Sequence, residues 1–351
     1  MDPPDLTGDG AALWRWVLDP AAAVDVPRDP RSAAAGLSFQ LSPALAAFLL
    51  APLAERLGWS PVDEAAVANA RLLGRFAAHR QRAVVARLAR AGLPFACIKG
   101  FASAHTLYPE PALRAFGDLD LLVRPEDRAA LVDLLAADGF AFRALPRPWW
   151  AIVPSESAPP LVAADGGCNV DIHVAPDADP LPRALDAAAV IAAAATIRID
   201  GLAVRVPAPD HAVLIQVSNI AKDKFGPYAV RKLVDLARLL ARHAGALDPD
   251  RIVRTARAAR LSSPLAATMA LLGALGQPAR TLVPGTAPLD RAASAELGRI
   301  VDGWRTLAAG LPDAVTMLRR EWRLGADWPV PLGRAVRRIA GPLGRRRRAE
   351  P

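Results

Sequence analysis

The stretch that decides the fold is Gly117-Asp118-Leu119-Asp120-Leu121-Leu122-Val123. In a β-strand, side chains alternate between two faces, so Asp118 and Asp120 share one face and the odd-numbered aliphatic side chains share the other. The apolar face can be buried against helices. Two carboxylates this close repel each other unless a cation lies between them. Oxygen ligands of this kind suit Mg²⁺, which also coordinates phosphates. The stretch therefore predicts a strand that carries a metal site.

A second segment, Val170-Asp171-Ile172-His173-Val174, repeats this pattern later in the chain. Its three aliphatic side chains would share one face of a strand, and Asp171 and His173 would share the other. If the two strands are neighbours in one sheet, three carboxylates converge at one edge of that sheet. His173 then faces the same site. It either supports the carboxylates or contacts the substrate, or it is a polar histidine whose hydrogen bonds are satisfied within the fold.

A basic strand end precedes the two acidic strands. The apolar run from Pro94 to Ile98 predicts a buried strand, and Lys99-Gly100 connect it to a short helix over residues 102–107. A helix N-terminus presents free N–H groups and the positive end of the helix dipole, which favour phosphate. Gly100 lets the backbone approach a ligand closely. Gly117 leaves room where a larger side chain would crowd a phosphate.

The order of predicted elements is a helical front, a mixed centre and a helical back. Residues 42–90 and the chain after Pro209 have helical periodicity, whereas the centre contains strand patterns, with hairpin turns at 165–167 and 200–201. The helices expected after Pro209 span 210–222, 229–243, 250–260, 264–275, 290–309 and 331–340. We predict an α+β fold divided into an N-terminal helical region (1–90, loosely ordered to about residue 35), an α/β core (91–207), a C-terminal helical domain (208–345) and a basic tail (346–351).

The composition excludes several classes of protein. With 52% hydrophobic residues the chain can fill a folded core, and its two cysteines, Cys97 and Cys168, cannot build a disulfide framework or a cysteine-based zinc site. The longest apolar runs are too short to cross a bilayer. The start of the chain, Met1-Asp2-Pro3-Pro4-Asp5, has the wrong composition for a signal peptide. We therefore expect a cytoplasmic protein without a membrane partner.

The net charge of +8 permits an anionic partner, but the basic residues that produce it are strongly biased toward arginine. Of the 43 basic residues only four are lysine. A solvated surface rich in arginine accounts for this balance, so nucleic acid is a partner that the charge allows without favouring. The run Arg345-Arg346-Arg347-Arg348 lies at the C-terminal end. Nothing in the composition fixes the oligomeric state.

In combination, these motifs resemble the uncharacterised bacterial nucleotidyltransferase family of the DNA-polymerase-β superfamily. The resemblance covers about residues 65–245. The matching segments are Ile98-Lys99-Gly100, Leu107-Tyr108-Pro109, the run from Arg114 to Val123, Val170-Asp171-Ile172-His173 and the run from Arg231 to Arg238. It implies a small mixed polymerase-β-like sheet between helical regions. In one respect the chain departs from the wider superfamily, because the usual Gly-Ser after the first strand is here Lys99-Gly100.

The resemblance also implies a chemistry. Asp118 and Asp120 would hold two Mg²⁺ ions, with Mn²⁺ as the alternative, on the triphosphate of an NTP such as ATP. Asp171 would complete the metal site and take a proton from the acceptor hydroxyl. The acceptor would attack the α-phosphorus and pyrophosphate would leave. The acceptor itself is left open between a peptide, a sugar, a small natural product and RNA.

The lysines suggest where the phosphates bind. Because the chain favours arginine so strongly, each lysine is informative, and lysine is a compact point charge suited to phosphate. Lys99 ends the strand that leads into the predicted phosphate turn. Lys222, Lys224 and Lys232 lie at the start of the C-terminal helical domain, which in related enzymes closes over the triphosphate. We expect one of these three to contact the triphosphate, against the alternative that they lie in a solvated loop.

Two other functions compete with nucleotidyl transfer. One is a catalytically silent member of the fold that binds a nucleotide or a protein. The other is a glycosyltransferase, which also uses a D-x-D motif, although its nucleotide-binding strands would have to precede Asp118. Arg114 is a candidate substrate contact, and Asp235 is either a ligand or a buried helix partner. Trp149-Trp150 lie in a proline-rich loop, as packing residues or as a substrate contact.

Overall fold

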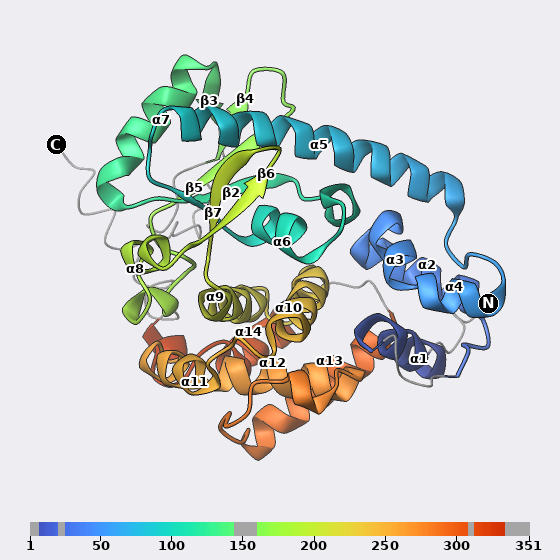
Figure 1. The fold of residues 1–351 in the computed structure, drawn as a ribbon. Helices are drawn as coiled ribbons and strands as arrows, with labels where there is room; N and C mark the ends of the chain where they lie inside the picture. The colour runs from blue at the N-terminus through green and yellow to red at the C-terminus, as the bar shows by residue number, and fades with distance from the viewer. Residues whose placement is uncertain (1–6, 20–24, 144–159, 308–311, 334–351) are drawn as a thin grey trace.

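A five-stranded mixed sheet lies above a body of helices in the computed structural model (Figure 1). The structure describes residues 7–19, 25–143, 160–307 and 312–333. The strand order is β1-β2-β5-β4-β3. The strands are β1 Ala96–Cys97, β2 Asp118–Leu122, β3 Phe140–Phe142, β4 Leu161–Ala163 and β5 Asn169–His173. Within the described chain the architecture is mixed α+β with helical flanks, as the sequence predicted.

The two acidic strands are central neighbours. β2 pairs with β5 in parallel, and this register sets Asp120 opposite Asp171. The other pairs, β1 with β2, β4 with β5 and β3 with β4, are antiparallel. The β4–β5 hairpin turns through Gly166, whose φ of 68° is the left-handed conformation that glycine adopts without strain. The expected neighbour relation between the two acidic strands is therefore confirmed.

Helices cover the apolar face of the sheet. The fully buried Leu119 and Leu121 of β2 pack with residues from the helices α5 (Glu64–Arg90), α6 (Lys99–Leu107) and α7 (Arg128–Ala137). A separate hairpin, β6 (Ala195–Ile199) and β7 (Leu202–Val206), joins the same hydrophobic cluster and contacts β1 and α5. The opposite face of β2, which carries the aspartates, is left to point toward the helical body.

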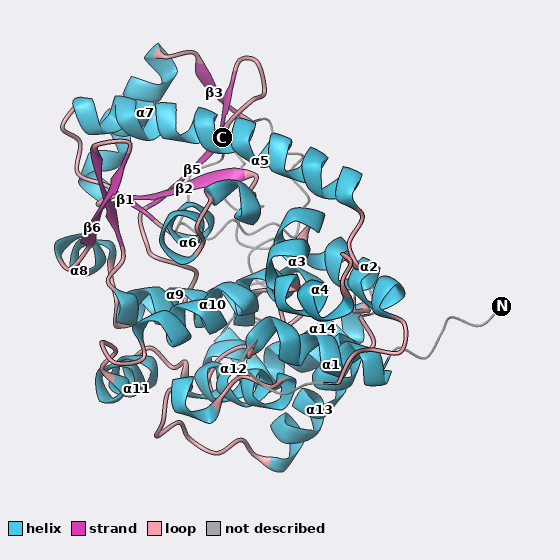
Figure 2. Ribbon diagram, turned by 45° about the vertical axis from the view of Figure 1, so that its right-hand side comes forward, coloured by secondary structure: helices cyan, strands magenta, loops and turns pink. Residues whose placement is uncertain are grey.

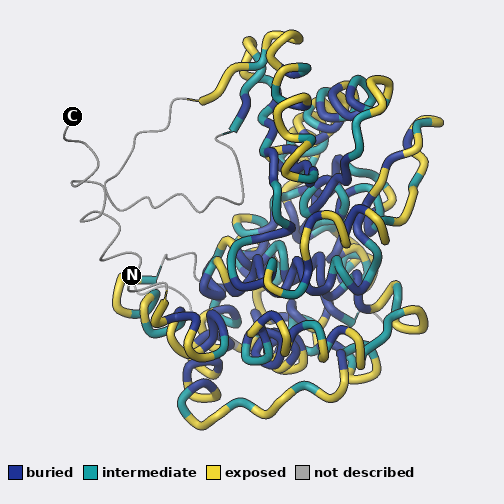
Figure 3. The backbone as a smooth tube through the Cα atoms, turned by 90° about the vertical axis from the view of Figure 1, so that its left-hand side faces the viewer, coloured by how far each residue is buried: buried dark blue, intermediate teal, exposed yellow. Residues whose placement is uncertain are grey.

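The helical body lies below the sheet and includes both ends of the described chain (Figure 2). Its C-terminal helices are α9 Pro209–Lys222, α10 Val230–His243, α11 Pro249–Ala258, α12 Ser262–Leu275, α13 Arg291–Arg305 and α14 Ala314–Leu324, and the short α8 Ala187–Ala192 packs beside α9. Its N-terminal helices are α1 Thr7–Leu18, α2 Pro30–Leu41, α3 Pro43–Leu49 and α4 Ala51–Leu57. Buried residues gather in the interior of both layers (Figure 3).

The expectation of a loosely ordered N-terminus is wrong for the described residues before position 35. In α1, Leu13 and Trp14 are fully buried, and the Trp14 indole donates a hydrogen bond of 2.9 Å to the Trp304 carbonyl on α13. The prolines and aspartates that suggested disorder serve instead to start a helix. Asp29 caps α2 through the Ser32 N–H, and Pro30 occupies the first turn.

The N-terminal helices do not form a unit of their own. α1–α4 share one hydrophobic cluster with α9–α13, whereas the second half of α5 belongs to the cluster on the apolar face of the sheet. α14 is a helix that the sequence pattern did not indicate, and its start is capped by Asp313. The helix expected over 331–340 and the tail at 346–351 lie largely or wholly outside the described residues. None of the described helices combines the length and hydropathy needed to cross a membrane.

Candidate functional site

The two parallel strands bring their acidic side chains to one place. Asp118 and Asp120 on β2 and Asp171 and His173 on β5 all line the same cleft, as strand alternation predicted. Asp120 and His173 are almost completely buried, Asp171 is half-buried and Asp118 is exposed at the surface. The site therefore grades from a buried floor to an outer carboxylate that water can reach.

A lysine balances the charge on the floor of the cleft. The Lys99 ammonium donates to Asp120 Oδ1 at 2.8 Å and lies 3.1 Å from His173 Nε2. His173 Nε2 is itself 2.7 Å from the same oxygen of Asp120. Burial opposes the charge on Asp120, but Lys99 and His173 hold the pKa of this carboxyl well below its usual range. Asp120 is therefore a permanent anion at the centre of the site.

The other two carboxyl groups behave in the opposite way. Burial and the negative charge of Asp120 raise the pKa of Asp118. Burial raises the pKa of Asp171 as well, followed by the charges of Asp120 and Asp118. Water reaches Asp118, but the surrounding cleft walls still disfavour its charged form. Crowded carboxylates with raised pKa values are stabilised in their charged form when a cation joins them.

The donor set fits a metal ion. Asp120, Asp171 and His173 offer one ligand atom each, and these atoms lie within 4.8 Å of one another. Asp118 adds a fourth donor on the same wall of the cleft. The second ring nitrogen of His173, Nδ1, is buried and has no hydrogen-bond partner among the described residues. Carboxylate oxygens suit Mg²⁺ and Mn²⁺, and the imidazole widens the choice toward softer ions.

The N-terminus of α6 opens into this cleft. Lys99 and Gly100 form its first turn and line the cleft together with Gly117. A side chain at position 100 would bring its Cβ to 2.9 Å from Cβ of Phe116, so this glycine is required for close packing of α6 on the strand entry. A Cβ at position 117 would meet no atom within 4 Å. The space beside Gly117 is thus open to a ligand.

Helices α9 and α10 build the opposite wall of the cleft, which has a volume of about 700 Å³. Lys222 ends α9 and Lys232 lies in the first turn of α10, and both line the cleft. Lys222 pairs with the buried Asp177 at 2.9 Å, and Lys232 pairs with Asp223 at 2.6 Å. Two of the three clustered lysines therefore face the carboxylates across one cavity, and both already carry acidic partners.

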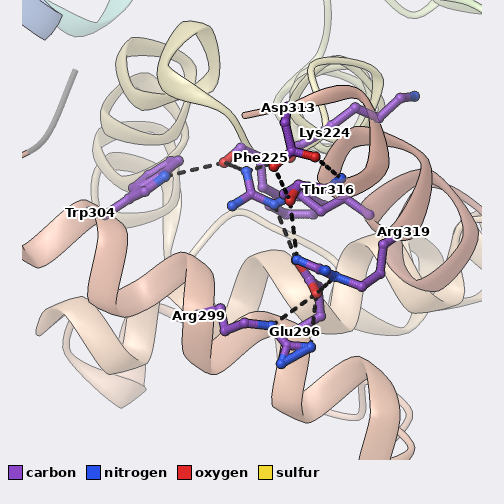
Figure 4. Close-up of polar contacts among 9 residues, drawn as sticks. Lys224, Phe225, Glu296, Arg299, Trp304, Asp313, Thr316 and Arg319 are labelled. Carbon is purple, nitrogen blue, oxygen red and sulfur yellow. Dashed lines mark hydrogen bonds and ion pairs between the residues drawn. The ribbon is translucent and has the colours of Figure 1, made fainter. Parts of the chain in front are cut away.

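The third lysine, Lys224, points elsewhere. Its backbone has a φ of 56° and the next residue, Phe225, has a φ of 52°, so the chain reverses direction directly after α9. Lys224 is buried and pairs with Glu321 on α14. Figure 4 shows this turn near Glu296, which pairs with Arg299 and Arg319. Arg320 also pairs with Glu296, and it donates to the carbonyls of Lys224 and Phe225 at 3.3 Å. Lys224 thus helps to dock α14.

Arg114 and Asp235 form a buried ion pair. The guanidinium of Arg114 donates to both carboxylate oxygens of Asp235, at 2.9 Å from Nε and 2.7 Å from Nη2. Tyr108 donates a third hydrogen bond of 2.7 Å to Asp235. Asp235 is therefore the buried helix partner that one of the two interpretations expected. The pair ties α10 to the segment that leads into β2, and both residues also reach the wall of the cleft.

The cleft contains residues that the sequence pattern did not single out. Phe39 and Gln40 come from α2, and Tyr228 comes from the turn into α10. Arg231, in the first turn of α10, also lines the cleft and begins the run from Arg231 to Arg238 that the sequence had already singled out. Residue 39 is remote from every motif, so only the docking of α2 against the body brings it here. Trp149-Trp150 and the arginine run at 345–348 lie outside the described residues.

Comparison with known proteins identifies a matching family. The model of a family described as uncharacterised nucleotidyltransferase matches residues 60–277, which is more than half of the chain. The matched segment contains Asp118, Asp120, Asp171 and His173 and the cleft lysines Lys99, Lys222 and Lys232, whereas α2 lies outside it. No curated protein matches the sequence.

Proposed function

The chain belongs to the uncharacterised nucleotidyltransferase family, and from this premise we propose that it is a metal-dependent enzyme that transfers the NMP group of an NTP to an acceptor hydroxyl or phosphate and releases pyrophosphate. The observation that supports the proposal is the pairing of β2 with β5, which sets Asp120 beside Asp171 with Asp118 and His173 on the same cleft. The volume of the cleft is within the range of small-molecule sites.

In this proposal Asp118, Asp120 and Asp171 hold the metal. When bound, Mg²⁺ or Mn²⁺ neutralises charge on the triphosphate and polarises the phosphorus that is attacked. Asp120 remains charged at every working pH, because Lys99 and His173 favour its anion. Asp118 is the outermost carboxylate and reaches the nucleotide first. Asp171 receives the proton of the acceptor hydroxyl, because it is the carboxylate of the neighbouring strand, directly opposite Asp120.

The reaction would proceed by displacement at the α-phosphorus. The acceptor oxygen forms a bond to the phosphorus as its proton passes to Asp171, and the bond to the bridging oxygen breaks, so pyrophosphate takes the electron pair. The β and γ phosphates lie between the N-terminus of α6 and the wall that carries Lys222 and Lys232. Positioning and charge neutralisation supply most of the catalysis of such transfers.

The direct test is metal-dependent pyrophosphate release. The full chain is incubated with each of the four NTPs, with Mg²⁺ or Mn²⁺ and a panel of peptide, sugar, small-molecule and RNA acceptors, and pyrophosphate is quantified with and without EDTA. We expect release that requires both the metal and one acceptor class. Release of UDP from nucleotide-sugars would instead indicate a glycosyltransferase, and tight NTP binding without pyrophosphate from any acceptor would favour a silent member of the fold.

A further inference from the structure

The two most exposed aromatic side chains of the described residues both line the cleft. Phe39 on α2 is 77% exposed and Tyr228, in the turn before α10, is 71% exposed. An exposed aromatic ring buries nothing in the free protein, so it contributes nothing to the core. A large apolar group that lines a cavity is typical of a ligand contact. These two rings therefore provide flat apolar surfaces in the same cleft as the acidic residues.

Polar groups of the same wall lack partners. Gln40 follows Phe39, and its side-chain oxygen Oε1 is buried without a hydrogen-bond partner among the described residues. Nε of Arg231 is also buried without a hydrogen-bond partner among the described residues, although Nη1 of the same guanidinium donates to the Ala115 carbonyl at 3.1 Å. Buried polar atoms are nearly always hydrogen-bonded in native proteins. Both residues line the cleft, so their side chains bring to it an acceptor and a donor that the described residues leave unused and that the polar edge of a ligand can engage once the side chains turn toward it.

We propose that Phe39, Gln40, Tyr228 and Arg231 form the site for the nucleobase of the donor NTP. This inference rests on the function proposed above. A nucleobase has a planar π-face that stacks on aromatic rings, and its edge carries donors and acceptors in one plane. The phosphates of the same nucleotide occupy the charged part of the cleft, between the acidic edge and Lys222 and Lys232. The base is therefore recognised by residues distinct from those that bind the phosphates.

Half of this site comes from outside the segment that the family match covers. α2 spans Pro30–Leu41, whereas the match begins at residue 60. α2 is placed by its contacts with α3 and α10 and by the burial of Leu37 and Leu41 in the helical body. The acidic edge thus lies within the matched segment, while half of the proposed base site lies on a helix before that segment.

The test separates the nucleoside from the phosphates. Dissociation constants are measured by calorimetry for the full chain with Mg²⁺ and two ligands, namely the tightest-binding of the four NTPs and inorganic tripolyphosphate. Tyr228→Ala and Phe39→Ala should each weaken NTP binding about tenfold, as loss of a stacking ring does, and leave tripolyphosphate binding within about twofold. Tyr228→Phe should retain NTP affinity, because the ring remains.

A matched control is available on α5. Phe76 is also an exposed aromatic residue, at 58%, and it is not part of the cleft wall, so Phe76→Ala should change neither constant. Gln40→Leu should narrow the differences in affinity among the four NTPs, because it removes the polar group that reads the base edge. Thermal unfolding of each variant shows whether the fold is retained.

Three results would overturn the inference. The first is NTP affinity within about twofold of wild type in both Tyr228→Ala and Phe39→Ala, which would assign this wall to the acceptor. The second is an equal loss of NTP and tripolyphosphate binding, which would make the effect structural. The third is a wild-type chain that binds neither ligand with Mg²⁺, which would remove the proposed function itself and this inference with it.

Discussion

One wall of the cleft is built from strands that carry carboxylates, and the other is built from helices whose lysines are paired with acidic side chains. The acidic wall consists of two adjacent strands whose side-chain directions follow from alternation and register. The basic wall consists of the end of α9 and the start of α10, joined by a turn. All four polar residues of the acidic wall face the cleft, whereas only two of the three lysines do. The local sequence of a strand thus fixes the direction of its side chains, whereas the local sequence of a turn between helices does not.

The turn after α9 shows why one of the three lysines does not face the cleft. Lys222 and Lys224 are two residues apart, but positive φ values at Lys224 and Phe225 reverse the chain between them. Arg320 on α14 holds the carbonyls of that turn, and Glu321 accepts the Lys224 ammonium. A helix that begins almost ninety residues later in the sequence therefore decides where this lysine points. The following predictions use this contrast between the two walls.

The largest effect is expected on the acidic wall. Asp120→Asn and Asp118→Asn should each reduce metal-dependent pyrophosphate release by more than about 100-fold, because loss of a ligand charge removes several kcal/mol of charge stabilisation in the transition state. The measurement is initial rate at saturating NTP and Mg²⁺. Asp133→Asn on the exposed face of α7 makes the same chemical change outside the cleft and should be neutral. Retention of more than about a tenth of wild-type turnover would contradict the metal site.

Asp171 should separate turnover from binding. As the base it acts in the transition state, and Asp118 and Asp120 still hold the metal-nucleotide in its absence, so Asp171→Ala should lower kcat by about 100-fold while NTP affinity changes much less. Single-turnover kinetics and equilibrium binding of Mg-NTP measure the two quantities. If the variant fails to bind Mg-NTP but reacts normally at saturation, Asp171 is a nucleotide ligand and its assignment as the base is wrong.

The basic wall should give a smaller effect that depends on the lysine chosen. Lys232→Met should weaken Mg-NTP binding about tenfold, because it removes a charge that faces the phosphates. Lys224→Met should leave NTP affinity unchanged and lower the free energy of unfolding, by up to about 3 kcal/mol, since it breaks a buried ion pair with Glu321. Calorimetry and denaturant unfolding report the two quantities. The opposite pattern, with affinity lost only in Lys224→Met, would refute the assigned orientations.

The smallest expected effect is on the pH at which the protein loses its affinity for the metal. The pKa values of Asp118 and Asp171 are raised, so these groups bind protons at a higher pH than an ordinary aspartate, near 4. A protonated carboxyl does not hold a metal, so Mn²⁺ affinity should begin to fall, as the pH is lowered, before the ordinary range is reached. Titrations of Mn²⁺ from about pH 7.5 to 4.5 measure it. A metal affinity that stays constant down to about pH 4.5 would show that neither group is a ligand with a raised pKa.

Local patterns carried most of the information about the sheet. The strands β2 and β5 and the hairpin turn at Gly166 follow from alternation, apolar runs and turn residues, because these features depend on neighbours in sequence. For the N-terminal prolines and aspartates, by contrast, the local pattern did not predict the observed structure. They indicate disorder in isolation, and they start α2 only because the body buries its apolar face.

The sequence by itself determined which residues come together on the acidic wall of the cleft. Tertiary structure alone decided that His173 and Lys99 meet on Asp120, that Arg114 is bound by Asp235 and that Lys224 leaves the cleft. It also decided that Phe39 and Gln40 enter the cleft from α2. Each of these contacts joins segments distant in sequence, and its direction depends on how the two layers pack. Side-chain periodicity describes one element at a time, so no pattern within a single segment contains that information.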